Sequence, residues 1–183
     1  PLTPHQSAEY QKVRDMFRRA ARAEKRGALD LEAVKHLSPN TFARVPEEMH
    51  EEVARRLQKS AGILKEQALK RVVDEAPAEH NAKIQHLLKA VPEHLKNGRP
   101  VVIFTSRYAP FDMLKAAFEA KGIKVAGIRG GMTTEEKDRE KLKFHPETGE
   151  PEAQVLIATD AAQTGVNLQR GKELYQYDLP MTA

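Results

Sequence analysis

Residues 155–169, with the sequence VLIATDAAQTGVNLQ, constrain the fold of this chain more than any other stretch. Four consecutive apolar residues open it, a pattern typical of a strand buried on both faces, as strands of parallel sheets are. The residues that follow are small or polar, and they include Thr159, Asp160, Gly165 and Asn167. In open α/β sheets, ligands bind where loops converge at the carboxyl ends of the strands. The stretch therefore predicts a parallel sheet with a binding site just past this strand.

The rest of residues 77–183 predicts the other elements of such a sheet. Apolar runs indicate strands at 101–104, 123–126 and 173–177, and helical periodicity indicates helices near 84–91, 108–121 and 134–144. Thr133 and Glu136 form a capping box at the start of the last of these helices. Strands and helices that alternate at this spacing form right-handed βαβ units. We therefore expect an α/β fold, with a parallel sheet flanked by helices.

Residues 1–76 predict a separate helical segment. Thr3 and Gln6 form a capping box with Pro4 at the first helical position, and this helix should end near Gly27. Asp30 is placed to cap a shorter helix. Residues 46–74 then carry an apolar residue near every fourth position, which predicts one long helical segment with one packed face.

The first helix also carries a stripe of cations. It consists of Arg14, Arg18, Arg22 and Arg26, with Arg19 and Lys25 beside them. Such a stripe is typical of a solvated helix face, and it also suits docking along a phosphate backbone. No aromatic residues interleave with it to stack on bases, so the sequence leaves both interpretations open.

Composition narrows the class of protein. Of the 183 residues, 40% are hydrophobic and 31% are charged, which is typical of a globular chain with one core, or one domain plus an appendage. No apolar run approaches the roughly 20 residues that cross a bilayer, and no signal peptide is recognisable, so no membrane association is expected. The absence of cysteine favours a reducing, intracellular compartment. The seven histidines lack metal-binding spacing, so no metal site is predicted. The net charge of +4 permits a phosphate-rich partner.

Three loops follow predicted strands and should meet at one edge of the sheet. They contain Thr105, Ser106 and Arg107 after the first strand, Arg129 and Gly130 after the second, and Thr159 onward after the third. Hydroxyls, guanidinium groups and glycine-exposed amides are donors that suit a phosphodiester backbone without sequence preference. The sequence contains no phosphate loop, no acidic pair beside one, and no Ser-His-Asp or Cys-His arrangement. The chain by itself is therefore not expected to hydrolyse ATP.

The order of these segments resembles a known family. The segments are VVIFTSR at 101–107, IRGG at 128–131, VLIATD at 155–160, TGVNLQ at 164–169 and YDLP at 177–180. Together they resemble the second RecA-like lobe of superfamily 2 helicases, and within it the Swi/Snf-like DNA translocases. Asn167 and the YDLP segment point to that branch over the DEAD-box branch. Residues 1–76 resemble the helical part of such lobes loosely.

The resemblance implies a role for each matching residue. Thr105, Ser106 and Arg107 fall on motif IV and Thr159 with Asp160 on the start of motif V, which grip the nucleic acid or support that grip. Arg129 and Gly130 fall on a further loop expected to contact the backbone. Gly165 and Asn167 fall on the part of motif V that faces the nucleotide.

The resemblance also implies partners for the chain. The full-length protein would use ATP and Mg²⁺, hold double-stranded DNA, and work with an N-terminal RecA-like lobe in the cytoplasm, at a bacterial nucleoid, or in a nucleus. The family's motif VI arginines and phosphate loop are not in this sequence, so the chain resembles a fragment of a larger protein of this family.

Two other classes remain open from the residues. Phosphoribosyltransferases place a similar VLI-x-x-D…TG segment at a strand end, although they usually pair two acids where this chain has only Asp160. A non-enzymatic α/β interaction domain with a helical arm is the other alternative. Its mark would be an exposed apolar stripe on residues 46–74.

Overall fold

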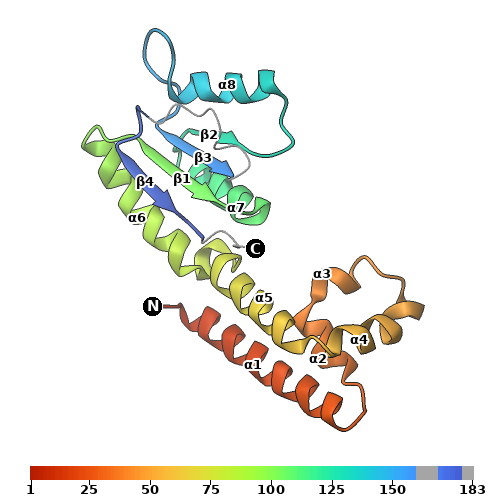
Figure 1. The fold of residues 1–183 in the computed structure, drawn as a ribbon. Coiled ribbons are helices and arrows are strands. Elements are labelled where there is room, and N and C mark those ends of the chain that lie inside the picture. The colour runs from red at the N-terminus through yellow and green to blue at the C-terminus, as the bar shows by residue number, and fades with distance from the viewer. Residues whose placement is uncertain (160–168, 179–183) are drawn as a thin grey trace. The chain divides into compact units, whose positions relative to one another are not determined.

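The computed structural model describes residues 1–159 and 169–178. The chain divides into two compact units, Pro1–Ala76 and Pro77–Ala183, and each is described separately below. Figure 1 shows that the first unit is made of helices and that the second contains the sheet. Among the described residues, no helix is both long and apolar enough to span a bilayer.

The first unit consists of short and medium-length helices. Its elements are α1 (Pro4–Lys25), α2 (Leu31–Leu37), α3 (Pro39–Phe42), the 3₁₀ helix η1 (Glu47–Met49), α4 (His50–Gln58) and α5 (Ala61–Asp74). The predicted capping box of Thr3 and Gln6 is confirmed. Gly27, just past the end of α1, has φ of 67°, a conformation that glycine adopts at little cost.

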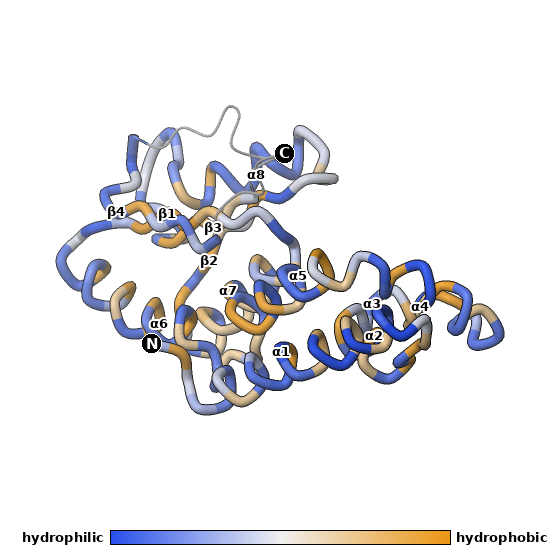
Figure 2. The backbone as a smooth tube through the Cα atoms, turned by 60° about the horizontal axis from the view of Figure 1, so that its bottom comes forward, coloured by the Kyte–Doolittle hydropathy of each residue, from blue (hydrophilic) through white to orange (hydrophobic). Residues whose placement is uncertain are grey.

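Apolar residues that recur at helical spacing form the core of this unit, as the alternating colours along the helices of Figure 2 indicate. Two glutamines are buried beside that core. The Gln6 side chain donates to the carbonyl oxygens of Val72 and Val73, both at 3.1 Å, and so satisfies the carboxyl end of α5. The Gln58 side chain accepts from the Asp30 backbone N–H at 2.9 Å and donates to the Ala28 carbonyl at 2.8 Å, which joins α4 to the turn before α2.

Asp30 caps α2 as predicted, because its carboxylate accepts from the Ala33 backbone N–H at 3.1 Å. Arg19 donates to the same carboxylate at 3.0 Å, and this bond holds the pKa of Asp30 below its ordinary value. A lowered carboxyl pKa stabilises the fold above the unfolded-state pKa of about 3.9, and that stabilisation is lost as the pH falls through the folded-state value.

The prediction of one long helical segment over residues 46–74 was wrong. The segment is divided into η1, α4 and α5, and Lys59 and Ser60 form a turn between the last two. Serine and glycine both have lower helix propensity than alanine or leucine, and Ser60 and Gly62 stand together at this point, so the break falls there. The apolar stripe nevertheless faces inward: Val53, Leu57, Leu64, Ala68 and Val72 all belong to the core of this unit or pack against it.

The second unit is built on a four-stranded parallel sheet, as predicted. Its strands are β1 (Val101–Thr105), β2 (Val125–Ile128), β3 (Val155–Thr159) and β4 (Glu173–Gln176), in the order β2-β3-β1-β4. The helical elements are η2 (Ala78–His80), α6 (Ala82–Lys96), α7 (Tyr108–Ala120) and α8 (Thr134–Phe144). The predicted capping box at Thr133 is confirmed.

Alternate residues of each inner strand face opposite sides of the sheet. Val101 and Ile103 join the core formed with α6 and α7, whereas Val102 and Phe104 join the core formed with Phe144 of α8. Figure 1 shows α6 and α7 on one face of the sheet and α8 on the other. All residues of β1 and β3 are buried, which confirms that both faces are covered.

Strand β2 lies two residues further along the chain than predicted, at Val125–Ile128 instead of 123–126. Ile123 belongs to the turn after α7, because its backbone N–H donates to the Phe118 carbonyl at 3.1 Å. Within β2, Gly127 leaves space for the ring of Phe111: a Cβ at Gly127 would lie 2.7 Å from Phe111 Cζ. Sequence periodicity does not indicate this contact. The close approach of the Phe111 ring is the reason that a glycine stands inside the strand.

Candidate nucleic-acid interface

The carboxyl ends of β1, β2 and β3 meet at one edge of the sheet. Parallel pairing places Thr105 beside Thr159 and Ile128 beside Ala158, so the loops after these three strands begin side by side. The structure therefore brings the three predicted loops together as far as Thr159. Asp160, Gly165 and Asn167 lie outside the described residues.

The loop after β1 is anchored by the buried carboxylate of Asp178. The Thr105 hydroxyl donates to Asp178 Oδ2 at 2.9 Å, and the Ser106 backbone N–H donates to Oδ1 at 2.6 Å. Arg107 Nε lies 3.8 Å from Oδ2, so the guanidinium balances the buried negative charge. The Asp178 side chain is fully buried, whereas that of Arg107 is 28% exposed. These contacts fix the backbone at Ser106 and Arg107.

Asp178 reaches this position because the chain continues the parallel pairing beyond β4. The Tyr177 backbone N–H donates to the Phe104 carbonyl at 2.8 Å, which places the next residue beside the end of β1. Two residues at the start of α6 hold Tyr177: Asn81 Nδ2 donates to its hydroxyl at 3.1 Å, and Lys83 Nζ donates to its carbonyl at 2.8 Å. Sequence reasoning assigned Asp178 no role, although the YDLP segment that contains it was the available signal.

Within the part of the chain that the structure describes, a hydrogen bond joins the loop after β2 to the end of β3. The Gly130 backbone N–H donates to Thr159 Oγ1 at 3.1 Å. Thr159 is only 2% exposed and Thr105 is fully buried, so both hydroxyls act within the edge of the sheet. The two threonines therefore hold the loops in shape through hydrogen bonds inside the edge of the sheet.

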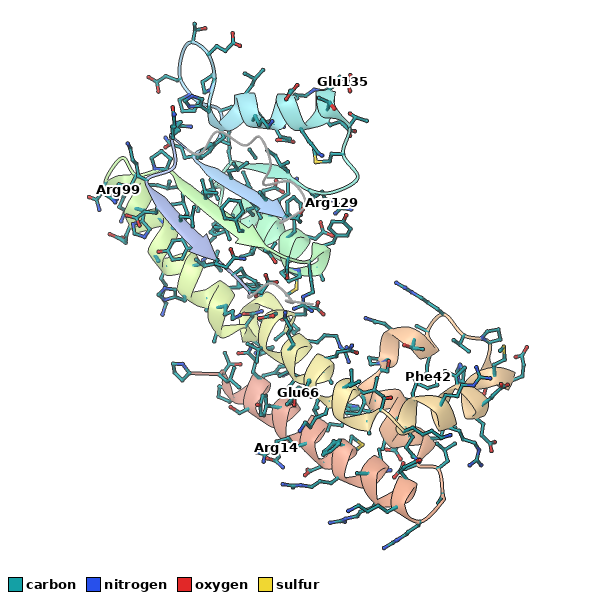
Figure 3. The ribbon with its side chains drawn as sticks, viewed as in Figure 1. Arg14, Phe42, Glu66, Arg99, Arg129 and Glu135 are labelled. Carbon is teal, nitrogen blue, oxygen red and sulfur yellow. The ribbon has the colours of Figure 1, made fainter. Side chains whose placement is uncertain are left out.

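Arg129 presents its guanidinium above the start of α7. Its Nη1 lies 3.0 Å from the Asp112 carboxylate, and its guanidinium lies 4.6 Å from the ring centroid of Tyr108. Figure 3 labels Arg129 just past the end of β2. Because Arg129 and Asp112 are 39% and 63% exposed, the ion pair is weak, and a phosphate could replace the carboxylate.

The edge thus offers the partly exposed guanidinium groups of Arg107 and Arg129 as donors at its surface. The Ser106 hydroxyl is buried and has no hydrogen-bond partner within residues 1–159 and 169–178. The Asp178 carboxylate beside the end of β1 is already bound to its neighbours. In the same described part of the chain, no group of His, Asp or Glu side chains is arranged to hold a metal ion. The chemistry of the described residues therefore suits recognition of phosphate.

Comparison with known proteins identifies the family. Residues 82–183, more than half of the chain, match the helicase conserved C-terminal domain. This chain belongs to that family. The matched residues include the whole sheet. This match supports neither of the two alternatives, a phosphoribosyltransferase or an unrelated interaction domain.

Curated relatives in the helicase family match this chain over about half of its 183 residues. The RNA polymerase-associated protein RapA of Vibrio parahaemolyticus is 32% identical over 101 residues, which cover 55% of this chain and 10% of RapA. The ATP-dependent RNA helicase abstrakt of Drosophila melanogaster is 29% identical over 99 residues, covering 54% of this chain and 15% of abstrakt. The chain therefore spans a small part of these proteins.

Solved structures match this chain over nearly its whole length, including the helical first unit. The Sulfolobus solfataricus SWI2/SNF2 ATPase C-terminal domain covers 97% of this chain and matches over 68% of its own, with a TM-score of 0.64 and 18% identity. The C-terminal part of the Fun30 ATPase domain covers 98% of this chain and matches over 73% of its own, with a TM-score of 0.64 and 15% identity. The fold is thus that of a second RecA-like lobe of the Swi/Snf type, as the sequence predicted.

Proposed function

We propose that this chain is the C-terminal lobe of an ATP-dependent, Swi/Snf-like DNA translocase. The family assignment and the fold support this proposal, and so does the similarity to RapA. One structural neighbour is a Sulfolobus solfataricus SWI2/SNF2 ATPase core in complex with double-stranded DNA, which favours DNA as the partner. The observation that carries the proposal is that the ends of three strands meet at one edge, where Arg107 and Arg129 supply phosphate-compatible donors and Asp178 fixes the loop after β1.

In this proposal the residues at the edge divide into two groups. Arg107 and Arg129 contact the phosphates of the tracked strand. Ser106 and Gly130 use their backbone N–H groups within the edge and hold the two loops that carry these arginines. Thr105 and Thr159 are buried and hydrogen-bonded within the edge, so they hold the loops in shape. Because none of these donors reads a base edge, binding should show little sequence preference.

The nucleotide site belongs mainly to another lobe in this proposal. ATP and Mg²⁺ would supply the phosphoryl-transfer chemistry and be held by an N-terminal RecA-like lobe. Gly165 and Asn167 of this chain would face the nucleotide. The protein would work inside the cell, at a bacterial nucleoid or in a nucleus, and this chain alone would not hydrolyse ATP.

Two arginines at opposite ends of β1 provide a matched test. Arg107 follows the strand at the proposed interface, whereas Arg99 precedes it and pairs with Glu173 at the other end of the sheet. In the full-length protein, Arg107→Gln should weaken duplex DNA binding at every sequence and reduce the slope of log affinity against log salt concentration by about 1. It should also lower DNA-stimulated ATPase activity.

Arg99→Gln removes the same charge and should change neither quantity. DNA affinities measured by fluorescence anisotropy from low to high salt give both slopes. Equal slopes for Arg107→Gln and the unmodified protein would remove this edge from the DNA interface.

A further inference from the structure

One face of α1 carries a concentration of positive charge that the proposed interface does not use. At 3.6 residues per turn, five cations fall within a sector of about 120° around the helix axis. We call this surface the α1 basic face, and it is made of Arg14, Arg18, Arg22, Lys25 and Arg26. It lies opposite the side on which Val13 and Ala20 are buried in the core. In Figure 3 the Arg14 side chain extends from α1 on the side away from α5.

The α1 basic face is poorly neutralised by acids. Asp15 is the one acid within the sector, and it lies 3.4 Å from Arg18. The other acid of this half of the helix, Glu24, accepts a hydrogen bond from buried Gln58 and is turned toward the core side. Among the residues that the structure describes, Arg14, Arg22 and Arg26 have no ion pair. The face therefore keeps most of its positive charge.

Helix α4 shows the alternative arrangement in the same unit. Arg55 and Arg56 are also exposed, but each pairs with a glutamate one turn earlier, Glu51 at 2.9 Å and Glu52 at 2.7 Å. Such spacing keeps an arginine-rich face solvated and nearly neutral. The α1 basic face lacks these glutamates. The helix dipole favours cations in the last turn, at Arg22 and Lys25, but its effect does not extend to Arg14.

We propose that the α1 basic face binds the phosphate backbone of duplex DNA, as a second contact separate from the sheet edge. Arg14 and Arg26 are 12 residues apart, so the face extends about 18 Å along the helix. With about 3.4 Å of axis per phosphate on one strand, this length matches about five phosphates. Exposed arginines donate to phosphate oxygens without reading sequence. The proposal takes its ligand from the proposed function and adds a surface that the strand-end loops do not include.

Two double variants with the same change in charge test this proposal in the full-length protein. Arg22→Gln/Arg26→Gln removes two cations from the α1 basic face, and Arg55→Gln/Arg56→Gln removes two that are already paired. Each phosphate contact contributes about 0.9 to the slope of log affinity against log salt concentration. The α1 variant should therefore reduce the slope by about 1.8 on a duplex of mixed sequence, and the α4 variant should leave it unchanged. All four arginines are exposed, so circular dichroism should show unaltered folding.

The possible outcomes separate this proposal from the proposed function. Equal slopes for the two variants, whether both fall or neither does, would overturn the role of the α1 basic face. If the two double variants have equal slopes but Arg107→Gln reduces the slope, the DNA contact at the sheet edge is supported and the contact at the α1 basic face is refuted. A loss of binding to poly-glutamate without a loss of binding to DNA would assign the face to an acidic protein and refute the proposal. An unmodified protein without salt-dependent DNA binding would overturn both.

Discussion

Asp178 shows how much of the site depends on one residue. Its carboxylate accepts a hydroxyl and a backbone N–H from the loop after β1, and Arg107 lies beside it. All of these groups belong to residues 105–107, which lie 71 to 73 residues earlier in the chain. A buried charge whose partners are all in place stabilises the fold, but each partner left alone would carry its full desolvation penalty. The loop therefore keeps its shape only while this carboxylate is present.

Replacement of Asp178 should destabilise the protein strongly. Asp178→Ala leaves the Thr105 hydroxyl and the Ser106 backbone N–H without an acceptor, and we expect the free energy of unfolding to fall by about 3 kcal/mol. Urea denaturation measures this change. Asp112→Ala is the control, because it removes an exposed carboxylate that also pairs with an arginine, and it should cost less than about 1 kcal/mol. Equal losses for the two variants would contradict the anchoring role.

At the scale of elements, the packing of β2 against α7 depends on the absence of a side chain. Gly127 lies in the strand with Phe111 directly above it, and the Phe111 ring is 4% exposed. The ring is enclosed by the core around the sheet, so it has little room to move. The contact sets how closely α7 approaches the strand that leads to Arg129 and Gly130.

Gly127→Ala should therefore destabilise the fold, although alanine is ordinarily better tolerated than glycine in a strand. The added Cβ would lie 2.7 Å from Phe111 Cζ, and we expect a loss of about 1–3 kcal/mol from overpacking. Gly62→Ala in α5 meets nothing within 4 Å and should be neutral or slightly stabilising. Thermal melts of both variants give the comparison, and a Gly127→Ala protein as stable as the unmodified chain would show that α7 shifts easily.

At the scale of the whole molecule, the two units have separate hydrophobic cores. Residues buried among α1, α2, α4 and α5 belong to one cluster, and those around the sheet belong to two others. Among residues 1–159 and 169–178, no core cluster contains residues from both sides of the boundary between Ala76 and Pro77. Residues that are buried in the same core tend to unfold together, so each unit should have its own free energy of opening.

A core truncation in the first unit should therefore act mainly within that unit. Leu64 is 6% exposed, and Leu64→Ala should cost the first unit about 2–5 kcal/mol. Amide hydrogen exchange should accelerate in α1, α2 and α5, with exchange in β1 and β3 unchanged. Uniform acceleration across both units would show that they unfold together.

The sequence predicted the layout of the sheet well, because buried parallel strands and helix caps have local signatures. The runs at Val101 and Val155 and the capping boxes at Thr3 and Thr133 each occupy a few consecutive residues. The break at Ser60 was missed because the apolar period continues across it.

Features that depend on distant contacts could not be read in the same way. The anchoring by Asp178 joins segments more than 70 residues apart, and no local pattern indicates it. The shift of β2 has a local cause instead, the turn in which the Ile123 N–H donates to the Phe118 carbonyl. The positions of Ser106, Arg107, Arg129 and Gly130 at one edge were predictable from strand order alone, but the partners that hold them there were not.

The separation between Ser106 and Asp178 also has a consequence for timing. A chain is synthesised from its amino terminus, and contacts between distant residues form late because a long loop must close first. The core partners of the first unit's helices lie within residues 1–76, so these helices can pack while synthesis of the second unit continues. The loop after β1 cannot be anchored until β4 and Asp178 have been synthesised and have paired with β1, so we expect the phosphate-facing edge to be among the last parts of the second unit to form.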